Sequence, residues 1–561
     1  MERRTGEPRL AELDRQAPAL LGSGRAVRLP DQLDELAALT YRGHPWARLV
    51  VGCALGDVDP SDGRGLEHMR AALRTFRRRG DTAGEAYACF ILGCRAGERG
   101  DIARAVHWWE AAHQVDGPAP PGLELMLAHR FLDAYAVGRL PEALTMAEEA
   151  VALARLRGNL RAEATALVNL AFVRLWTGDF AAASDTLDAA EDAFAEVPAP
   201  ADRYEWPLCS GARAVLSALR GDIAAADTEF ARAVDAARDI RWEWYEAIVR
   251  SARAEFTAQL DHRQAMADAR WALAELEGRA DQWWSAWAAQ AMGVATREAG
   301  MPGAAVAMLR KVLDREQIPL ECARTRLVLG ETLIRAGRSG DAVPVLREAA
   351  DVFTAAGARY WTVRCQVRLA QADPVEASRW WSRARKGMTD DPAYHVLFGG
   401  GSLILRAFGP GEIRCEGHPL RVRTHNSERA LFQLALAGPG GLHIEELADR
   451  LWPEVMVERR KILGRIRTLL WEMRQVLGAQ AWRLERDGAI VRLDMIGVSF
   501  DLLEARESAR AASGPVAGEA ADRLRAPLLT RWRYEEWVCE EESRNALLAD
   551  LLAVRAGRPR L

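Results

Sequence analysis

The sequence has almost no lysine, with three lysines and 72 arginines among its 561 residues. This bias is typical of GC-rich genomes, so a single surface arginine indicates little about function. The chain also lacks any run of about 18 apolar residues, which excludes a predicted membrane span. Its first 16 residues, MERRTGEPRLAELDRQ, lack the apolar core of a signal peptide. We therefore expect a cytoplasmic protein with no membrane partner.

Motifs of common enzymes and metal sites are also missing. The eight cysteines are scattered and form no CxxC pair, a distribution that favours reduced, buried thiols over a disulfide framework or a zinc site. No GxxxxGK[ST] loop, GxSxG or HExxH motif occurs. His107 and His113, six residues apart, are predicted to be surface or packing residues. We predict a protein that is not an enzyme and that holds no metal or other cofactor.

A repeated pattern of small residues runs through the middle of the chain. A small residue is followed by glycine and then by two alanines at fixed spacings, as in Gly93, Gly100, Ala105 and Ala112. The turn positions of the eight copies are residues 100, 138, 178, 221, 260, 300, 337 and 372. Small side chains let antiparallel helices approach closely, and glycine supplies the turn between them. The pattern therefore predicts an α-solenoid of helical hairpins.

Some copies resemble the tetratricopeptide repeat, or TPR. The Gly-Asp phrases at 100–101, 178–179 and 221–222 each precede an alanine-rich stretch. The spacing exceeds the usual repeat of about 34 residues, so we expect longer helices, similar to the repeat domains of large bacterial transcriptional activators. Such a solenoid offers a curved surface, lined by the first helix of each pair, for a peptide, a protein or a small molecule.

Aromatic residues mark a candidate binding region in this solenoid. Two predicted first helices open with aromatic clusters, Trp242, Trp244 and Tyr245 in one and Trp283, Trp284 and Trp287 in the other. Tryptophans in a groove can anchor a peptide or a flat ligand; the alternative is that these rings fill gaps between long helices. The repeat register places Arg250 and Trp287 on the groove side. We predict Arg250, Trp283 and Trp287 as groove residues.

The pattern changes after residues 387–401, where Asp391-Pro392 and three glycines interrupt the helices. The following elements are predicted to be short strands at 403–408, 412–415 and 420–422, a helix from Ser427 to Gly438, a helix from His443 to Trp452, a basic helix, and a hairpin from Ala481 to Asp494 around Asp487-Gly488. Strands followed by three helices and a hairpin predict a winged helix–turn–helix. In such a fold the third helix can enter the major groove of DNA.

The basic helix, ERRKILGRIRTLLWEMRQVLG, spans Glu458 to Gly478. Its apolar residues recur at helical spacing, while six basic and two acidic residues give a net charge of +4 in a chain whose total is −4. Arginine suits both phosphate oxygens and guanine edges. The alternative is a solvated amphipathic helix. The predicted DNA-binding residues of this helix are Arg459, Arg460, Lys461, Arg465, Arg467 and Arg474.

The block from Leu403 to Asp494 resembles the OmpR/PhoB-type winged helix of SARP-type bacterial transcriptional activators. The stretches that carry this resemblance are ELADRLWPE (446–454) and IRTLLWEMRQVLG (466–478). Further matches to the adjoining bacterial transcriptional activator domain are DLL (501–503), LRAPLL (524–529) and YEEWVCEEE (534–542). The resemblance implies a DNA-binding domain followed by the first helical hairpin of the activator domain.

The chain also departs from this family. The DNA-binding domain usually comes first, whereas here it follows the solenoid. Trp471 and Glu472 stand where the family has serine and arginine, and a glutamate facing DNA would weaken binding. Arg467 and Arg474 match the family's arginine positions. Three arginines of the hairpin, Arg483, Arg486 and Arg492, are predicted to contact phosphate.

These observations predict a mostly α protein with five segments. They are an N-terminal helical segment (1–80), the solenoid (81–386), a linker (387–401), the winged helix–turn–helix (402–498) and a partial activator-domain helical region (499–561). The predicted function is a transcription regulator that binds double-stranded promoter DNA and receives an effector in its solenoid. RNA polymerase and a second copy of the chain are further candidate partners. The alternative is a TPR scaffold whose winged helix contacts a protein; Glu472 and the low net charge of residues 402–498, +3 from 15 basic and 12 acidic residues, favour it.

Overall fold

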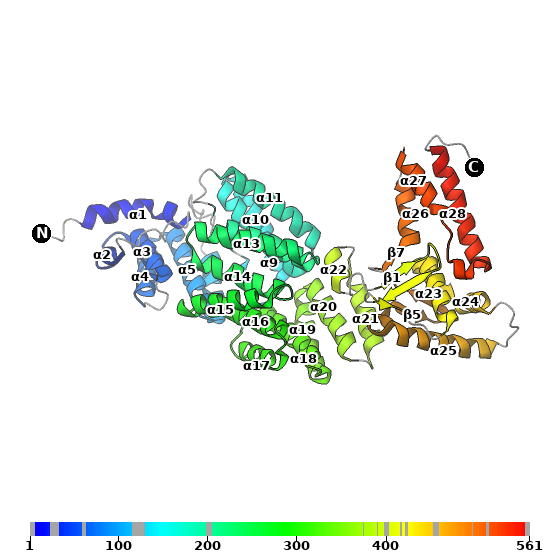
Figure 1. The fold of residues 1–561 in the computed structure, drawn as a ribbon. Coiled ribbons are helices and arrows are strands. Elements are labelled where there is room, and N and C mark those ends of the chain that lie inside the picture. Colours follow the sequence, from blue (N-terminus) through cyan, green and yellow to red (C-terminus); the bar gives the residue numbers. More distant parts are fainter. Residues whose placement is uncertain are drawn as a thin grey trace. The chain divides into compact units, whose positions relative to one another are not determined.

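The computed structural model describes most of the chain as two compact units, residues 1–393 and 394–561 (Figure 1). The described residues are 6–22, 33–58, 63–114, 128–129, 131–197, 203, 205–373, 375–389, 391–397, 403–415, 418–420, 424–452, 459–495, 498–511 and 515–555. Helices dominate both units, so the prediction of a mostly α protein is confirmed. Among the described residues, no helix is long and apolar enough to cross a membrane.

The first unit consists of helices, of which most are 12 to 18 residues long. In chain order they are α1 (Gly6–Gly22), α2 (Leu33–Ala37), α3 (Pro45–Val58), α4 (Gly63–Arg79), α5 (Thr82–Glu98), α6 (Ile102–His113), α8 (Leu132–Ala136), α9 (Leu140–Leu156), α10 (Leu160–Thr177), α11 (Phe180–Glu196), α12 (Trp206–Leu219), α13 (Ile223–Asp239), α14 (Glu243–Thr257), α15 (His262–Gly278), α16 (Gln282–Glu298), α17 (Pro302–Leu313), α18 (Pro319–Arg335), α19 (Ser339–Ala356), α20 (Arg359–Ala372) and α21 (Ala377–Lys386). A short helix, α22 (Pro392–Leu397), includes the division between the units.

The described helices between α5 and α21 form eight antiparallel pairs, which confirms the predicted solenoid. Six of the predicted turn positions, residues 100, 138, 178, 221, 300 and 337, are glycines with positive φ, a backbone conformation that other residues rarely adopt. In the Gly-Asp phrases, Asp101, Asp179 and Asp222 cap the second helix through side-chain oxygens that accept a backbone N–H.

Close packing within each pair explains the small residue that begins the repeat. Three of the glycines at this position face a large side chain 16 residues later, Gly93 facing Trp109, Gly293 facing Leu309 and Gly330 facing Leu346. A Cβ atom on Gly93 or Gly330 would lie 2.4 Å from its neighbour, and one on Gly293 would lie 2.9 Å away. The repeat is therefore a packing signature, because a larger residue would force the two helices apart.

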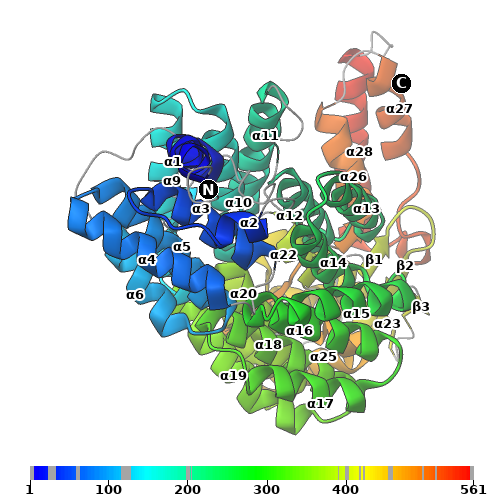
Figure 2. The ribbon, with the colours of Figure 1, turned by 90° about the vertical axis from the view of Figure 1, so that its left-hand side faces the viewer.

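The solenoid also contacts itself four or five pairs further along the chain. First helix α5 touches α16, and α10 touches α20 (Figure 2). Between these, Tyr135 of α8 contacts α16 and α18. These contacts join helices that are four or five pairs apart, so the array coils tightly enough for successive turns to pack together. On these helices, the faces that we expected to line a groove are in contact with first helices of another turn.

In its described residues, the second unit combines two small sheets with six helices and short 3₁₀ segments. Its elements are β1 (Leu403–Arg406), β2 (Glu412–Cys415), β3 (His418–Pro419), α23 (His425–Ala437), η5 (Gly438–Gly440), β4 (Leu442–His443), α24 (Ile444–Leu451), α25 (Arg459–Leu477), η6 (Gly478–Arg483), β5 (Leu484–Asp487), β6 (Ile490–Leu493), β7 (Val498–Phe500), α26 (Asp501–Ala511), α27 (Pro515–Leu524), η7 (Thr530–Trp532) and α28 (Glu536–Arg555). The sheet orders are β3-β2-β1-β7, with only β1 and β7 parallel, and β4-β6-β5, which is antiparallel.

Residues 499–561, predicted to form a separate helical region, share a core with the preceding domain. Leu502, Leu528, Leu529 and Trp532 belong to the same buried cluster as the apolar faces of α23, α24 and α25. A bridge pairs Phe408 with Leu528. The Asp501 carboxylate accepts hydrogen bonds from the backbone N–H groups of residues 407 and 408, which links the family-like DLL phrase to the first strand.

The sequence misplaced several boundaries in this unit. The third strand is His418–Pro419 rather than 420–422, of which residues 421 and 422 lie outside the described residues. Helix α23 starts at His425 with Thr424 as its N-cap, rather than at Ser427. Strands β4 and β7 were not predicted, because two or three residues carry no periodic signal. The described part of the C-terminal region contains three helices, α26, α27 and α28, where one helical hairpin was expected.

Candidate nucleic-acid interface and solenoid interior

Helix α25 buries its apolar face and exposes a basic flank. Ile466, Leu469, Met473 and Leu477 are at most 4% exposed and pack in the core of the second unit. Arg467, Trp471 and Arg474 are exposed and spaced by four and three residues, so they lie along one flank of the helix. We call these three residues the α25 flank.

The α25 flank lies beside the hairpin β5–β6. The Nη2 atom of Arg474 donates a hydrogen bond to the backbone oxygen of Leu484, the first residue of β5, at 3.1 Å. Gly488, at the hairpin turn, has φ 59°, as a tight hairpin requires. The helix flank and the hairpin thus form one continuous surface.

Glu472 turns away from this flank. Successive helical residues differ by about 100° in direction, which separates Glu472 from Trp471. Its Oε2 atom accepts a hydrogen bond from the Thr424 hydroxyl, the N-cap residue of α23, at 3.3 Å. The glutamate that departs from the family's pattern is therefore directed toward the start of α23, where its charge is held apart from the arginines.

The other predicted basic residues of α25 have different surroundings. Arg465 is exposed, but its guanidinium carbon lies 5.7 Å from the centre of the Trp452 ring, on the side of the helix toward Glu472. Residues 459–461 belong to α25, but the side chains of Arg459, Arg460 and Lys461 lie outside the described residues.

The prediction that Arg483 contacts phosphate is wrong. Its side chain is fully buried; Nε donates to Gln480 Oε1 at 2.8 Å, and Nη1 donates to the backbone oxygen of Asp494 at 3.2 Å. Asp494 in turn donates its N–H to the backbone oxygen of Arg483. Arg483 therefore closes the base of the hairpin. Sequence reasoning missed this role because alternation alone does not distinguish an inward-facing arginine from an outward-facing one.

The two remaining hairpin arginines are accessible. Arg486 is exposed near the hairpin turn, and its Nε donates to the backbone oxygen of Gly488 at 3.0 Å. Arg492 is partly exposed, with Nη1 3.8 Å from the Oδ2 atom of Asp487. The ion pair between Arg492 and the exposed Asp487 is weak at this distance. The guanidinium groups of Arg486 and Arg492 can therefore turn toward a phosphate.

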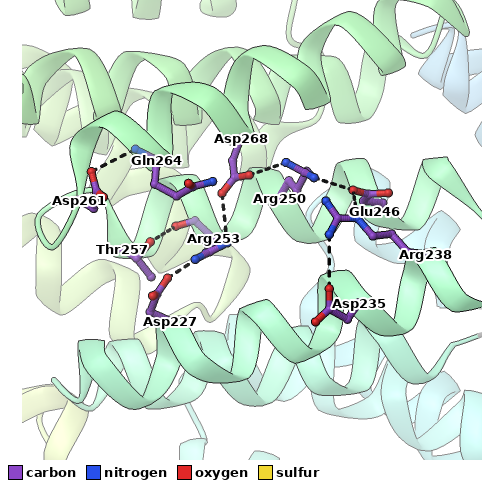
Figure 3. Close-up of polar contacts among 10 residues, drawn as sticks. All are labelled: Asp227, Asp235, Arg238, Glu246, Arg250, Arg253, Thr257, Asp261, Gln264 and Asp268. Carbon is purple, nitrogen blue, oxygen red and sulfur yellow. Dashed lines mark hydrogen bonds and ion pairs between the residues drawn. The ribbon is translucent and has the colours of Figure 1, made fainter.

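In the solenoid, Arg250 is part of a chain of ion pairs across α13, α14 and α15 (Figure 3). Its guanidinium lies 2.7 Å from both Glu246 Oε1 and Asp268 Oδ1, and it covers the Trp271 ring at 4.5 Å. Asp268 is 1% exposed and also lies 3.6 Å from Arg253. Arg250 thus neutralises a buried carboxylate, and a ligand would have to break this pair to use it.

The predicted tryptophans contact the solenoid's own side chains. Trp283 stacks on Tyr135 of α8 with ring centres 6.2 Å apart and planes 10° apart. Trp287 donates through Nε1 to Glu255, and its ring is covered by Arg324 at 4.6 Å. Both rings also adjoin Trp284. These contacts favour the second hypothesis from the sequence, in which the tryptophan rings fill space between helices.

A polar cluster between the solenoid turns was not predicted. The Tyr135 hydroxyl donates to Glu321 at 2.5 Å, and Arg324 lies 3.1 Å from Glu321 and 3.4 Å from Glu255. All four side chains are buried. Burial, followed by the negative charge of Glu321, raises the pKa of Tyr135 well above its ordinary value. Tyr135 and Glu321 are 186 residues apart, and no local sequence signal joins them.

Asp281 is a buried carboxyl group whose environment predicts a pH-dependent stability of the solenoid. It caps α16 by accepting the N–H of Trp284 at 3.0 Å and accepts Trp244 Nε1–H at 2.8 Å. It is 3% exposed. Burial, followed by the charge of Glu98 on α5, raises its pKa to about 7, against the opposing effect of the N–H donors from Trp244, Trp284 and Trp283.

A carboxyl group with a raised pKa stabilises the fold when it is protonated. Its contribution is complete below the unfolded pKa of about 4 and is lost as pH rises to about 7. We expect the thermal unfolding temperature of the solenoid to fall over this range by an amount corresponding to a few kcal/mol, on the order of 1.4 kcal/mol per pKa unit. Asp281→Asn should flatten this dependence. Asp222→Asn, which alters an exposed N-cap, serves as control; equal slopes in both variants would contradict the assignment.

Within the described ranges, no group of three or more histidine, cysteine or acidic side chains is placed to hold a metal ion. No protein-family model and no curated protein matches the sequence. Among solved structures, the crystal structure of Rap protein complexed with competence and sporulation factor aligns with 12% identity and a TM-score of 0.35, covering 68% of this chain and all of that one. The TPR domain of P58(IPK) aligns with 18% identity and a TM-score of 0.17, covering 69% of this chain and 98% of that one. Both TM-scores are below 0.5, so the description of the solenoid rests on its helix pairs.

Proposed function

We propose that this chain is a non-enzymatic transcription regulator whose second unit is a winged helix that binds double-stranded DNA. The observation that carries the proposal is the α25 flank, which exposes two arginines and a tryptophan on a helix whose other face is buried, and whose last arginine, Arg474, bonds the hairpin β5–β6. A helix anchored in this way can enter a major groove while a hairpin reaches the neighbouring backbone. In this proposal α25 is the recognition helix, and β5 and β6 form the wing.

Several details support the assignment of individual residues. Arg467 and Arg474 contact base edges or phosphates in the groove. Arg486 and Arg492 contact phosphate from the wing. Strand β4 pairs with β6 directly before α24, which ties the wing to the helices and gives it a defined direction. Thr424 holds Glu472 beside α23, so the departure from the family's pattern does not place a negative charge on the α25 flank.

A salt series tests DNA binding directly. We expect the full chain to bind a random-sequence duplex with an affinity that falls about a hundredfold between 50 and 200 mM salt, as four or more phosphate contacts require. Fluorescence anisotropy with a labelled 30-base-pair duplex would measure it. Albumin, which has no such flank, controls for background. A flat salt dependence would contradict the proposal and would favour the protein-interaction scaffold, for which the exposed Trp471 would be an anchor.

We propose that the solenoid receives a protein, a peptide or a small molecule, which is the remaining part of the predicted function. Support comes from the stacked helix pairs, because such solenoids commonly serve as interaction surfaces. Tyr135 already stacks on Trp283 and bonds Glu321, so a partner at that place would have to displace it. Homodimer formation and contact with RNA polymerase stay predictions from the sequence.

A further inference from the structure

Trp471 is unusual among the tryptophans of this chain. Of those whose side chains the structure describes, it alone is more than half exposed, at 55%. On the described part of α25 it is also the only large apolar side chain that is exposed. The helix does not need this residue for its core, because Leu470 and Met473 already fill the neighbouring buried positions. An exposed indole at the centre of a proposed binding surface indicates a contact with the ligand.

Its neighbours restrict what that contact can be. Arg467 precedes Trp471 by four residues and Arg474 follows it by three, so positive charge lies on both sides of the ring along the helix. Two arginines favour a polyanion, while the indole between them favours an apolar group. Duplex DNA offers both at once only in the major groove, where the thymine C5 methyl group is the apolar feature of the base edges.

Resting on the proposed DNA binding, we propose that Trp471 is a specificity-determining residue that packs on thymine methyl groups in the major groove. The ligand class is therefore duplex DNA with thymine at the position that faces the middle of α25. The flanking arginines hold the phosphates or guanine edges on either side. The ring reads a methyl group, so cytosine, which lacks one, is disfavoured, and 5-methylcytosine is accepted in its place.

The test uses the full chain and a duplex selected from a random-sequence library. Each thymine of the selected site is replaced in turn by deoxyuridine, which keeps every hydrogen bond and removes only the methyl group. We expect wild-type affinity to fall about fourfold at one or two positions, as burial of one methyl group predicts. Trp471→Ala should bind less tightly and should not distinguish thymine from deoxyuridine. Tyr534→Ala is the matched control, since Tyr534 is an aromatic residue of the same unit, 87% exposed and outside α25.

The outcomes separate this inference from the proposed function. If selection recovers no site and the chain does not bind DNA, both fail. If the chain binds a selected site but deoxyuridine has no effect, or if Trp471→Ala keeps the preference for thymine, the inference fails and DNA binding stands. A selected site without any thymine would also overturn it. Loss of the deoxyuridine effect in Trp471→Ala alone, with Tyr534→Ala like wild type, is the expected result.

Discussion

Replacing Arg467 with alanine is expected to weaken DNA binding by the full chain at least tenfold, whereas Arg465→Ala should change it less than threefold. A guanidinium group in contact with a base edge or phosphate contributes about 1–3 kcal/mol, and each factor of ten is about 1.4 kcal/mol. Both arginines are exposed on the same helix and two residues apart. They differ in direction, because Arg467 lies on the α25 flank and Arg465 lies over Trp452.

Comparing Arg465→Ala with Arg467→Ala distinguishes a specific interface from non-specific electrostatic attraction. Both variants lose one positive charge, so a purely non-specific attraction would weaken equally in each. If both side chains contact phosphate, the double variant Arg467→Ala, Arg474→Ala should have a salt slope about two units smaller in magnitude than that of the wild type. Anisotropy titrations at four salt concentrations measure both effects, and thermal unfolding confirms that the variants are folded. Equal losses in Arg465→Ala and Arg467→Ala would contradict the proposed orientation of α25.

Much of the solenoid could be predicted from sequence because its signal is local and repeated. A glycine such as Gly178 must adopt a left-handed conformation, and a glycine such as Gly330 must pack on Leu346. The first demand recurs in six of the eight helix pairs and the second in three, so several weak signals reinforce one another. The contact between Tyr135 and Glu321 has no such signature, because it depends on how tightly the whole array coils.

The position of α25 and its exposed face could be predicted from the sequence, whereas the burial of Arg483 could not. Charge and periodicity located α25 and its exposed arginines, because helical spacing translates directly into faces. The same reasoning could not assign Arg483, since one buried arginine in a short hairpin has no periodic context. Its burial follows from Gln480 and the backbone of Asp494, which together accept its hydrogen bonds. Glu472 was likewise ambiguous until Thr424 supplied its partner.

The resemblance to known activators predicted that residues 402–498 and 499–561 are separate regions. Their shared core predicts that removing the second region destabilises the first. A chain that ends at Phe500 should lose cooperative folding of its second unit. It would lack Leu502, Leu528, Leu529 and Trp532, all buried in the cluster that holds α23 to α25. Removing even one such side chain costs about 2–5 kcal/mol, and a domain has only about 5–15 kcal/mol in total.

Polar contacts add to the expected loss. Without the C-terminal region, Arg429 loses Glu535, to which its Nε donates at 2.9 Å. Glu428, 7% exposed, loses Arg531 at 2.7 Å. Buried charges left without their partners are costly. The matched control is a chain that ends at Arg555, which keeps all of these residues.

Hydrogen exchange followed by mass spectrometry distinguishes the two truncations. In the chain ending at Phe500, the amides of α23, α24 and α25 should exchange at least a hundredfold faster than in the full chain, because protection falls with the free energy of unfolding. The chain ending at Phe500 should also lose DNA binding. In the chain ending at Arg555 both should match the full chain. Protected amides and unchanged DNA affinity after truncation at Phe500 would mean that residues 403–500 fold alone, and that the C-terminal helices are an attachment whose role lies elsewhere.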